Sequence, residues 1–218
     1  ACGNGYCTAY FSQWVDEIIG ADYSEPLIKA ARQMIKDFLE KDVKIGNIKF
    51  DIADALNLPY PNESFDAVVA ERLLVNLPTS SDQERAVKEI YRVLMPKGIY
   101  IFSESTFQGH DNLNKIRNIF GLPNMEVHWH NLYVDENKFM PFAKQYFNLI
   151  DSTRFGTYHF LSKVIHPLIV APAEPKFDDK INIVARQVAE KMSDIDGIKN
   201  ASHHLCMIFE KKLEDILK

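Results

Sequence analysis

The chain has 218 residues, of which 46% are hydrophobic and 25% charged, a composition typical of a globular protein with a sizeable core. Its formal net charge is -5 and it contains no long run of Lys or Arg, which argues against nucleic acid as a partner because phosphate contacts need a basic face. The three cysteines are odd in number and lack a Cys-x-x-Cys spacing, so we expect reduced thiols and a cytoplasmic location. No apolar stretch approaches the ~18 residues of a membrane-spanning helix.

The chain begins with a glycine turn, in which Gly3 and Gly5 flank Asn4. Residues 8–13 predict a helix and residues 16–21 a strand that leads to Asp22. A glycine turn lets a ligand approach the backbone closely, and a carboxylate at the end of the next strand can bind two ribose hydroxyls. Together they predict a site for a nucleoside-containing cofactor at the carboxyl edge of a parallel sheet.

Such a turn normally follows a buried strand, and no strand precedes it in this sequence. We therefore expect a sheet whose first strand is missing. The alternative is that Ala1 is a true start after removal of an initiator Met.

The next elements alternate between strands and helices. Ser24 is placed to cap a helix, and residues 48–52, 65–70 and 99–103 predict strands, the second of them buried. Ser81 and Glu84 have the spacing of a capping box. The first helix is expected to bury Leu27, Ala31, Met34, Ile35 and Phe38, and the second Ala86, Val87, Ile90, Val93 and Leu94. This order predicts a parallel α/β sheet.

The second half of the chain is less regular. Residues 113–120, 160–170 and 179–192 predict helices, and Asp135 is placed to cap another. The last of these helices is expected to bury Ile181, Val184, Ala185, Val188, Ala189 and Met192. Residues 148–154 and 204–210 predict strands, followed by a charged tail over 211–218.

Five segments of the first half, in order, carry a family resemblance. They are Cys2-Gly3-Asn4-Gly5, Gly20-Ala21-Asp22-Tyr23-Ser24, Asp54-Ala55 with Leu58-Pro59-Tyr60-Pro61, Phe65-Asp66-Ala67-Val68-Val69, and residues 89–98. With them the chain resembles class I S-adenosylmethionine-dependent methyltransferases of the small-molecule type. The resemblance implies a Rossmann-like, mostly parallel sheet with helices on both faces, an antiparallel last strand and the first strand missing. The chain departs from the family pattern at two positions. Ala1 stands where the family usually has a further glycine of the turn, and Lys97 replaces a glycine before the last of the matching strands.

The resemblance implies one domain in two parts and assigns its cofactor, S-adenosylmethionine, to the first. Residues 1–106 form the cofactor half, and residues 107–218 form the acceptor-pocket insert and the C-terminal part. The resemblance assigns Gly3 and Gly5 to the methionine part of the cofactor, and Cys2 and Asn4 of the same turn are expected to bind the cofactor with them.

The other cofactor residues are assigned to the adenosine part of the cofactor, except Glu71. Asp22 is assigned to the ribose hydroxyls, Tyr23 to the adenine face, Asp54 to its amino group and the Ala55 amide to a ring nitrogen. Glu71 is assigned to the cofactor's amino-acid end or the acceptor. Alternatives remain open: Asp22 as a helix cap, Tyr23 as surface packing, Asp51 in place of Asp54, and an ion pair between Glu71 and Arg72.

The catalytic candidates are His128 and His130, which flank Trp129 in the region of the acceptor-binding insert. Either histidine could act as a base toward an acceptor hydroxyl. The alternatives are a structural role and a metal site, for which no further ligand stands at a convincing spacing, so we expect no metal. Glu104 and His110-Asp111 are weaker candidates, and His203-His204 is expected to be structural.

We therefore expect methyl transfer from S-adenosylmethionine to a small-molecule or sugar-type acceptor, with a mild preference for oxygen as the accepting atom. Two other classes remain open. One is a catalytically silent methyltransferase-like partner subunit, which the altered glycine turn permits. The other is a nicotinamide-dependent oxidoreductase, against which the absence of a third glycine at Thr8 argues.

Overall fold

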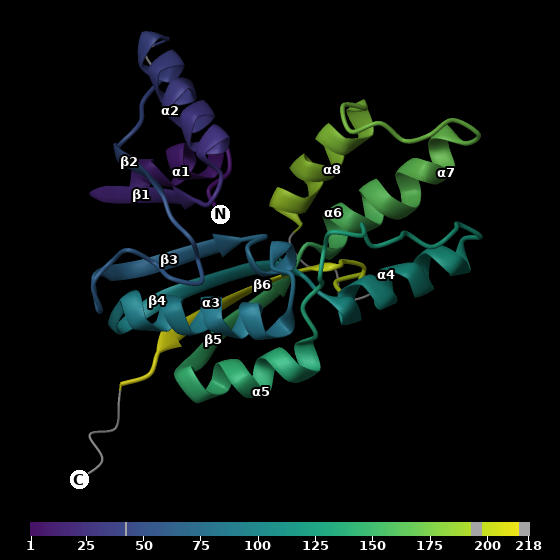
Figure 1. Cartoon of the computed structure of the whole chain (residues 1–218). Coiled ribbons are helices and arrows are strands. Elements are labelled where there is room, and N and C mark those ends of the chain that lie inside the picture. The colour runs from purple at the N-terminus through teal and green to yellow at the C-terminus, as the bar shows by residue number, and fades with distance from the viewer. Residues whose placement is uncertain (42, 193–197, 214–218) are drawn as a thin grey trace.

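The computed structural model describes residues 1–41, 43–192 and 198–213, which form an α/β fold (Figure 1). The elements of the first half are α1 (Tyr6–Phe11), β1 (Glu17–Asp22), α2 (Glu25–Glu40), β2 (Asn47–Ile52), β3 (Phe65–Glu71), α3 (Ser80–Val93) and β4 (Leu94–Ser105). Those of the second half are α4 (Phe107–Ile119), α5 (Glu136–Tyr146), β5 (Phe147–Arg154), α6 (Gly156–Phe160), α7 (His166–Val170), α8 (Lys180–Lys191) and β6 (His204–Lys211). Residues 214–218 of the expected charged tail lie outside the described part.

The strands form two separate hydrogen-bonded sheets. β1 and β2 pair in parallel, while the larger sheet has the order β3-β4-β6-β5. In it β3 and β4 are parallel, and β6 runs antiparallel to both β4 and β5, which confirms the antiparallel last strand. In the residues described, β1 pairs only with β2 and β3 only with β4, so each has one unpaired edge and the two sheets are not hydrogen-bonded to each other.

β3 is the element that differs most from its prediction. A buried strand is expected over 65–70, but Ala67 is exposed and the side chain of Val69 is 41% exposed. β3 pairs with β4 along one edge only, so it lacks the second neighbour that covers a central strand. The prediction of a fully buried strand is therefore wrong for the described chain.

The hydrophobic core follows the same division. The larger cluster joins β3, β4, β5 and β6 to α3 and α5, with Tyr100, Phe102, Phe147 and Phe209 at its centre. The smaller cluster is Ile28, Ala31 and Phe50, between α2 and β2. In α2 the expected Leu27 is 41% exposed, and Ile28 takes its place, because a two-stranded sheet covers only a narrow stripe of the helix. In α8, Val184 is likewise exposed, while Asn182 and Ala185 are buried.

Two of the three helix N-caps predicted from the sequence are confirmed. Ser24 accepts a hydrogen bond from the Leu27 amide, and Asp135 accepts one from the Asn137 amide, as expected. The capping box at Ser81 and Glu84 is wrong, because α3 begins earlier. Its cap is Thr79, whose hydroxyl accepts from the Asp82 amide at 3.1 Å.

The helices of the second half lie in two places (Figure 1). α5 packs with α3 along the larger sheet. α4 and the segment α6 to α8 lie together beyond the carboxyl ends of β3 and β4, and α6 continues into α7 through a π-helical stretch, Leu161–Ile165. Within the described residues, none of the helices combines the length and apolar character needed to cross a bilayer.

Candidate functional site

The glycine turn lies against the end of β1. The Cys2 amide donates to the Ala21 carbonyl at 2.9 Å, and the Gly3 amide donates to the Asp22 carboxylate at 2.8 Å. Gly3 and Gly5 have φ angles of 55° and 81°, in the left-handed region that favours glycine. The turn and the carboxylate predicted to bind one cofactor are thus directly hydrogen-bonded to each other.

The two glycines have different surroundings. A Cβ on Gly3 would meet no atom within 4 Å, so the space beside the Gly3 Cα is open. A Cβ on Gly5 would lie 2.7 Å from the Phe50 ring and 2.8 Å from the Ala31 methyl. Gly5 is therefore required for packing, whereas Gly3 borders a space that a ligand could fill. These residues fit the adenosine-containing cofactor that the sequence predicts.

Asp22 is buried, and both of its carboxylate oxygens accept backbone hydrogen bonds. Oδ2 accepts from Gly3 and Oδ1 from Ser24 at 2.9 Å. Ser24 itself caps α2 with its hydroxyl, so Asp22 does not serve as that cap. Each carboxylate oxygen has a further lone pair, which leaves capacity for two hydroxyl groups.

The remaining cofactor candidates are more exposed than Asp22 and make fewer hydrogen bonds. Tyr23 is 79% exposed and Asn4 is also exposed. Asp54 accepts from the Leu56 amide at 2.9 Å in a local turn that includes the half-buried Ala55. The rival Asp51 accepts the Tyr60 hydroxyl at 3.0 Å, so it already has a structural partner.

Glu71 connects the glycine segment to the larger sheet. It ends β3, and its carboxylate accepts the Cys7 thiol of α1 at 3.3 Å. Burial, followed by this contact, raises the pKa of Cys7 to about 11, so the thiol stays protonated. Among the described residues, no ion pair joins Glu71 to Arg72.

Glu104, a weaker catalytic candidate in the sequence, is a fully buried carboxylate. It accepts the amides of Leu74 and Val75 at 2.7 and 3.2 Å and thereby holds the loop after β3. Burial raises its pKa to about 7, although these hydrogen bonds act in the opposite direction.

His128 and His130, the catalytic candidates, lie in an exposed loop. Their rings stack at 5.7 Å, and Trp129 between them is 95% exposed. The structure gives them no contact with the glycine turn, and their catalytic role stays a prediction. The described part of the chain contains no group of three His, Cys, Asp or Glu side chains arranged to hold a metal ion.

Four other histidines gather in the fold: His110 and His159 of α4 and α6, His203 just before β6, and His204 at its start. The sequence offers His110 as a weaker catalytic candidate and expects His203-His204 to be structural. It gives no sign that these side chains come together, since only the fold brings them to one place.

Comparison with known proteins agrees with the fold and the turn. Residues 1–102 match a family model described as "Methyltransferase domain". The ubiquinone/menaquinone biosynthesis C-methyltransferase UbiE of Pasteurella multocida is 31% identical over 123 residues, which cover 55% of this chain and 43% of that protein. The chain thus spans less than half the length of the curated relatives it matches.

Solved structures of low sequence identity share the fold. A S-adenosylmethionine-dependent methyltransferase from Methanosarcina mazei superposes with a TM-score of 0.63 at 16% identity, covering 98% of this chain and 91% of its own. The [4+2]-cyclase SpnF gives a TM-score of 0.60 at 20% identity, covering 98% and 74%. Residues 1–102 thus match a methyltransferase domain, and the described chain shares the fold of S-adenosylmethionine-dependent methyltransferases.

Proposed function

We propose that the protein transfers a methyl group from S-adenosylmethionine to a small-molecule acceptor. The observation that carries the proposal is the hydrogen bond of 2.8 Å between the Gly3 amide and the Asp22 carboxylate, beside open space at the Gly3 Cα. When bound, S-adenosylmethionine supplies a methyl group already activated by the sulfonium charge. The protein then has mainly to align donor and acceptor.

The proposed roles of the cofactor residues follow from their positions. Asp22 accepts the ribose hydroxyls, and Tyr23 covers the adenine face. Asp54 and the Ala55 amide bind the adenine edge. Glu71, at the carboxyl end of β3, faces the methionine end of the cofactor or the acceptor. The backbone of Cys2, Gly3, Asn4 and Gly5 lies along the methionine part.

The accepting atom is proposed to be oxygen, with carbon as a second candidate. The relatives named for C-methylation in ubiquinone and menaquinone biosynthesis favour carbon, at about 31% identity. His128 and His130 are proposed as bases for an acceptor hydroxyl. A catalytically silent partner subunit is the remaining alternative, and the cyclase SpnF illustrates that one fold can host another activity.

The test is calorimetric titration of S-adenosylhomocysteine into the wild-type protein, Asp22→Asn and the matched control Asp16→Asn. Asp16 is an exposed carboxylate just before β1. We expect micromolar binding to the wild type and the control, and at least tenfold weaker binding to Asp22→Asn. Equal binding to all three would rule out Asp22 as the ribose ligand, and no binding to the folded wild type would refute the methyltransferase proposal.

A further inference from the structure

The four clustered histidines and Tyr133 form a continuous group of rings, here called the histidine cluster. The ring of His203 lies 4.5 Å from that of His159 and 6.3 Å, nearly parallel, from that of Tyr133. Tyr133 in turn lies 5.3 Å from His110. The residues come from α4, α6, the start of β6 and the loop before α5, so the cluster exists only in the folded chain.

The cluster is fixed to the carboxyl end of the sheet. The Thr106 amide donates to the His203 carbonyl at 2.8 Å, and the Ser103 hydroxyl lies 2.8 Å from Nε2 of His204. Glu71 pairs with Ser103 in the ladder between β3 and β4. Because Glu71 also contacts Cys7 of α1, the histidine cluster and the glycine turn lie at the same edge. Ligands of open α/β sheets bind at this edge.

Two ring nitrogens of the cluster are buried without a hydrogen-bond partner in the described residues: Nδ1 of His110 and Nδ1 of His203. An unpaired buried polar atom is costly, so each of these nitrogens needs a polar partner from outside the chain, which is either a water molecule or a ligand. The neighbouring ring of His159 is different. Its Nδ1 lies 3.1 Å from the Phe155 carbonyl, which can only accept a hydrogen bond, so that nitrogen carries hydrogen and is satisfied.

The proton on His110 can also be placed. The Met125 amide donates to Oδ1 of Asn114, which fixes the orientation of that side-chain amide. Nδ2 of Asn114 therefore donates to Nε2 of His110 at 3.1 Å. In the neutral ring the hydrogen is then on Nδ1, the nitrogen without a partner. His110 offers a free donor to a ligand oxygen.

The surroundings keep His203 neutral as well. Burial, with the charges of His204, Lys163, His110 and Arg72, lowers the pKa of His203 to about 3. The other groups that face it are the rings of Tyr133 and His159. A neutral imidazole nitrogen can accept a hydrogen bond from a hydroxyl or donate one to it, so a hydroxyl satisfies Nδ1 in either tautomer.

We propose that His110, Tyr133 and His203 bind the methyl acceptor, and that the free Nδ1 atoms of the two histidines form hydrogen bonds with hydroxyl groups on an acceptor ring. The proposal rests on the methyltransferase function proposed above and names the acceptor class of that site. The aromatic faces of Tyr133 and the nearby Phe107 would cover the ring. A hydroxylated aromatic and a sugar both present hydroxyl groups on a ring that has an apolar face, planar in the aromatic and puckered in the sugar.

The test follows the ring nitrogens of the histidines by NMR in the wild-type protein saturated with S-adenosylhomocysteine. The two probes are catechol and methyl β-glucopyranoside, each added to tens of millimolar. We expect one probe to shift the nitrogen signals of His110 and His203 and to leave that of His166, whose Nε2 lies 2.8 Å from Asp179, unchanged. The probe that binds identifies the acceptor class.

Variants give a second readout through the affinity of the probe that binds. His203→Phe keeps a flat ring without nitrogens and should weaken binding about tenfold, the loss of one buried hydrogen bond. His203→Asn keeps a polar atom near Nδ1 and should largely restore binding, and the control Phe177→Leu, at an exposed ring outside the cluster, should bind as the wild type does. Overturning results are no shift with either probe, a shift at His166 instead, or equal binding to His203→Phe. Failure to bind S-adenosylhomocysteine would instead refute the proposed function itself.

Discussion

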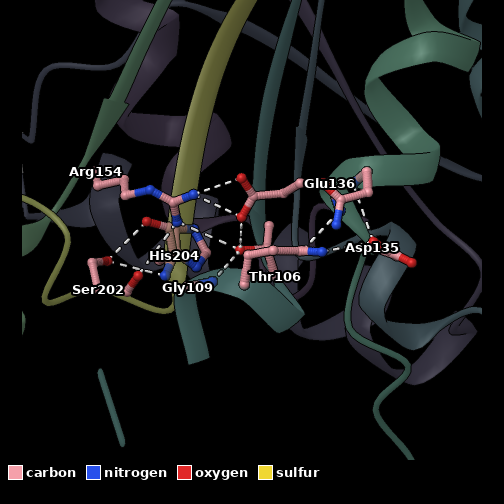
Figure 2. A network of polar contacts seen from close by, with 9 residues as sticks. Thr106, Gly109, Asp135, Glu136, Arg154, Ser202 and His204 are labelled. Carbon is pink, nitrogen blue, oxygen red and sulfur yellow. Dashed lines mark hydrogen bonds and ion pairs between the residues drawn. The ribbon is translucent and has the colours of Figure 1, made fainter. Parts of the chain in front are cut away.

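Arg154 and Glu136 form an ion pair in which one guanidinium nitrogen, Nη2, lies 2.7 Å from both carboxylate oxygens (Figure 2). Both side chains are largely buried, with 14% and 21% exposed. The Thr106 hydroxyl, which caps α4, also donates to Glu136, and Nη1 of Arg154 lies 3.4 Å from the Ser202 carbonyl. The pair therefore joins the end of β5 and the starts of α4 and α5 to the segment before β6, next to the histidine cluster.

Replacing Arg154 should destabilise the protein. In Arg154→Ala the carboxylate of Glu136 loses its partner in a partly buried place, and we expect a loss of about 2 kcal/mol, between the values for exposed and buried pairs. Denaturant unfolding measures this loss. Lys29→Ala is the matched control, because the pair of Lys29 with Glu25 is exposed on α2 and should contribute much less to stability. Similar losses in the two variants would contradict the structural role of Arg154.

The two glycines of the turn should separate stability from cofactor binding. Gly5→Ala places a methyl group against Phe50 and Ala31, so we expect a loss of about 2 kcal/mol or more in the free energy of unfolding. Gly3→Ala meets no neighbour and should cost about 1 kcal/mol for its left-handed backbone alone. Its methyl group enters the proposed cofactor space, so calorimetry should show at least tenfold weaker binding of S-adenosylhomocysteine.

Gly121 provides a control for the backbone cost of the Gly3 variant. It has a φ of 71° and open space around its Cα, and it lies beyond α4, away from the turn. Gly121→Ala should lose about as much stability as Gly3→Ala and bind the cofactor product normally. If Gly3→Ala also bound normally, the turn would not contact the cofactor.

Much of the fold could be predicted because its signals are local. The caps Ser24 and Asp135 and the apolar runs of β1, β2 and β6 depend on neighbouring residues only, and each was found within a residue or two. The exposure of Val69 could not be predicted in this way. An apolar strand has the same sequence whether one edge or both edges are paired, so only the tertiary arrangement decides its burial.

The same distinction between local and tertiary signals holds for the residues of the candidate site. Gly3 and Asp22 could be predicted because the turn and the strand end are close in sequence and carry a recognisable pattern. The meeting of His110 and His203 could not, although His110 is a weaker candidate in the sequence, since the two are separated by most of the second half and meet through the packing of α4 on β6. Their environment, which keeps both rings neutral and leaves two nitrogens unpaired, has no counterpart in the sequence pattern.

Glu104 should make the protein less stable as the pH rises. Its pKa is about 7 in the folded state and about 4.3 in an unfolded chain, so the folded protein binds more protons between these values. Stability from this group is present below about pH 4.3 and is lost as the pH rises to about 7. Glu104→Gln should remove this slope. Denaturant unfolding of both proteins across this range measures the difference, and parallel curves would contradict the raised pKa.

His204 should act in the opposite direction. Burial lowers its pKa to about 4, with Arg72 lowering it further and Glu71 opposing, whereas an unfolded histidine has a pKa of about 6.5. The unfolded chain binds more protons between these values, so stability is present above about pH 6.5 and is lost as the pH falls toward 4. We expect a contribution of about 2 kcal/mol over this range.

His204→Gln tests this contribution because its amide can keep the contact that Nε2 makes with the Ser103 hydroxyl while it removes the titrating group. The variant should lose about 2 kcal/mol less stability than the wild type between pH 6.5 and 4, measured by denaturant unfolding. The exposed control His128→Gln should follow the wild-type curve. If His204→Gln also followed that curve, the imidazole of His204 would take up its proton as readily in the folded chain as in the unfolded one, and burial at the end of the sheet would not be what keeps it neutral.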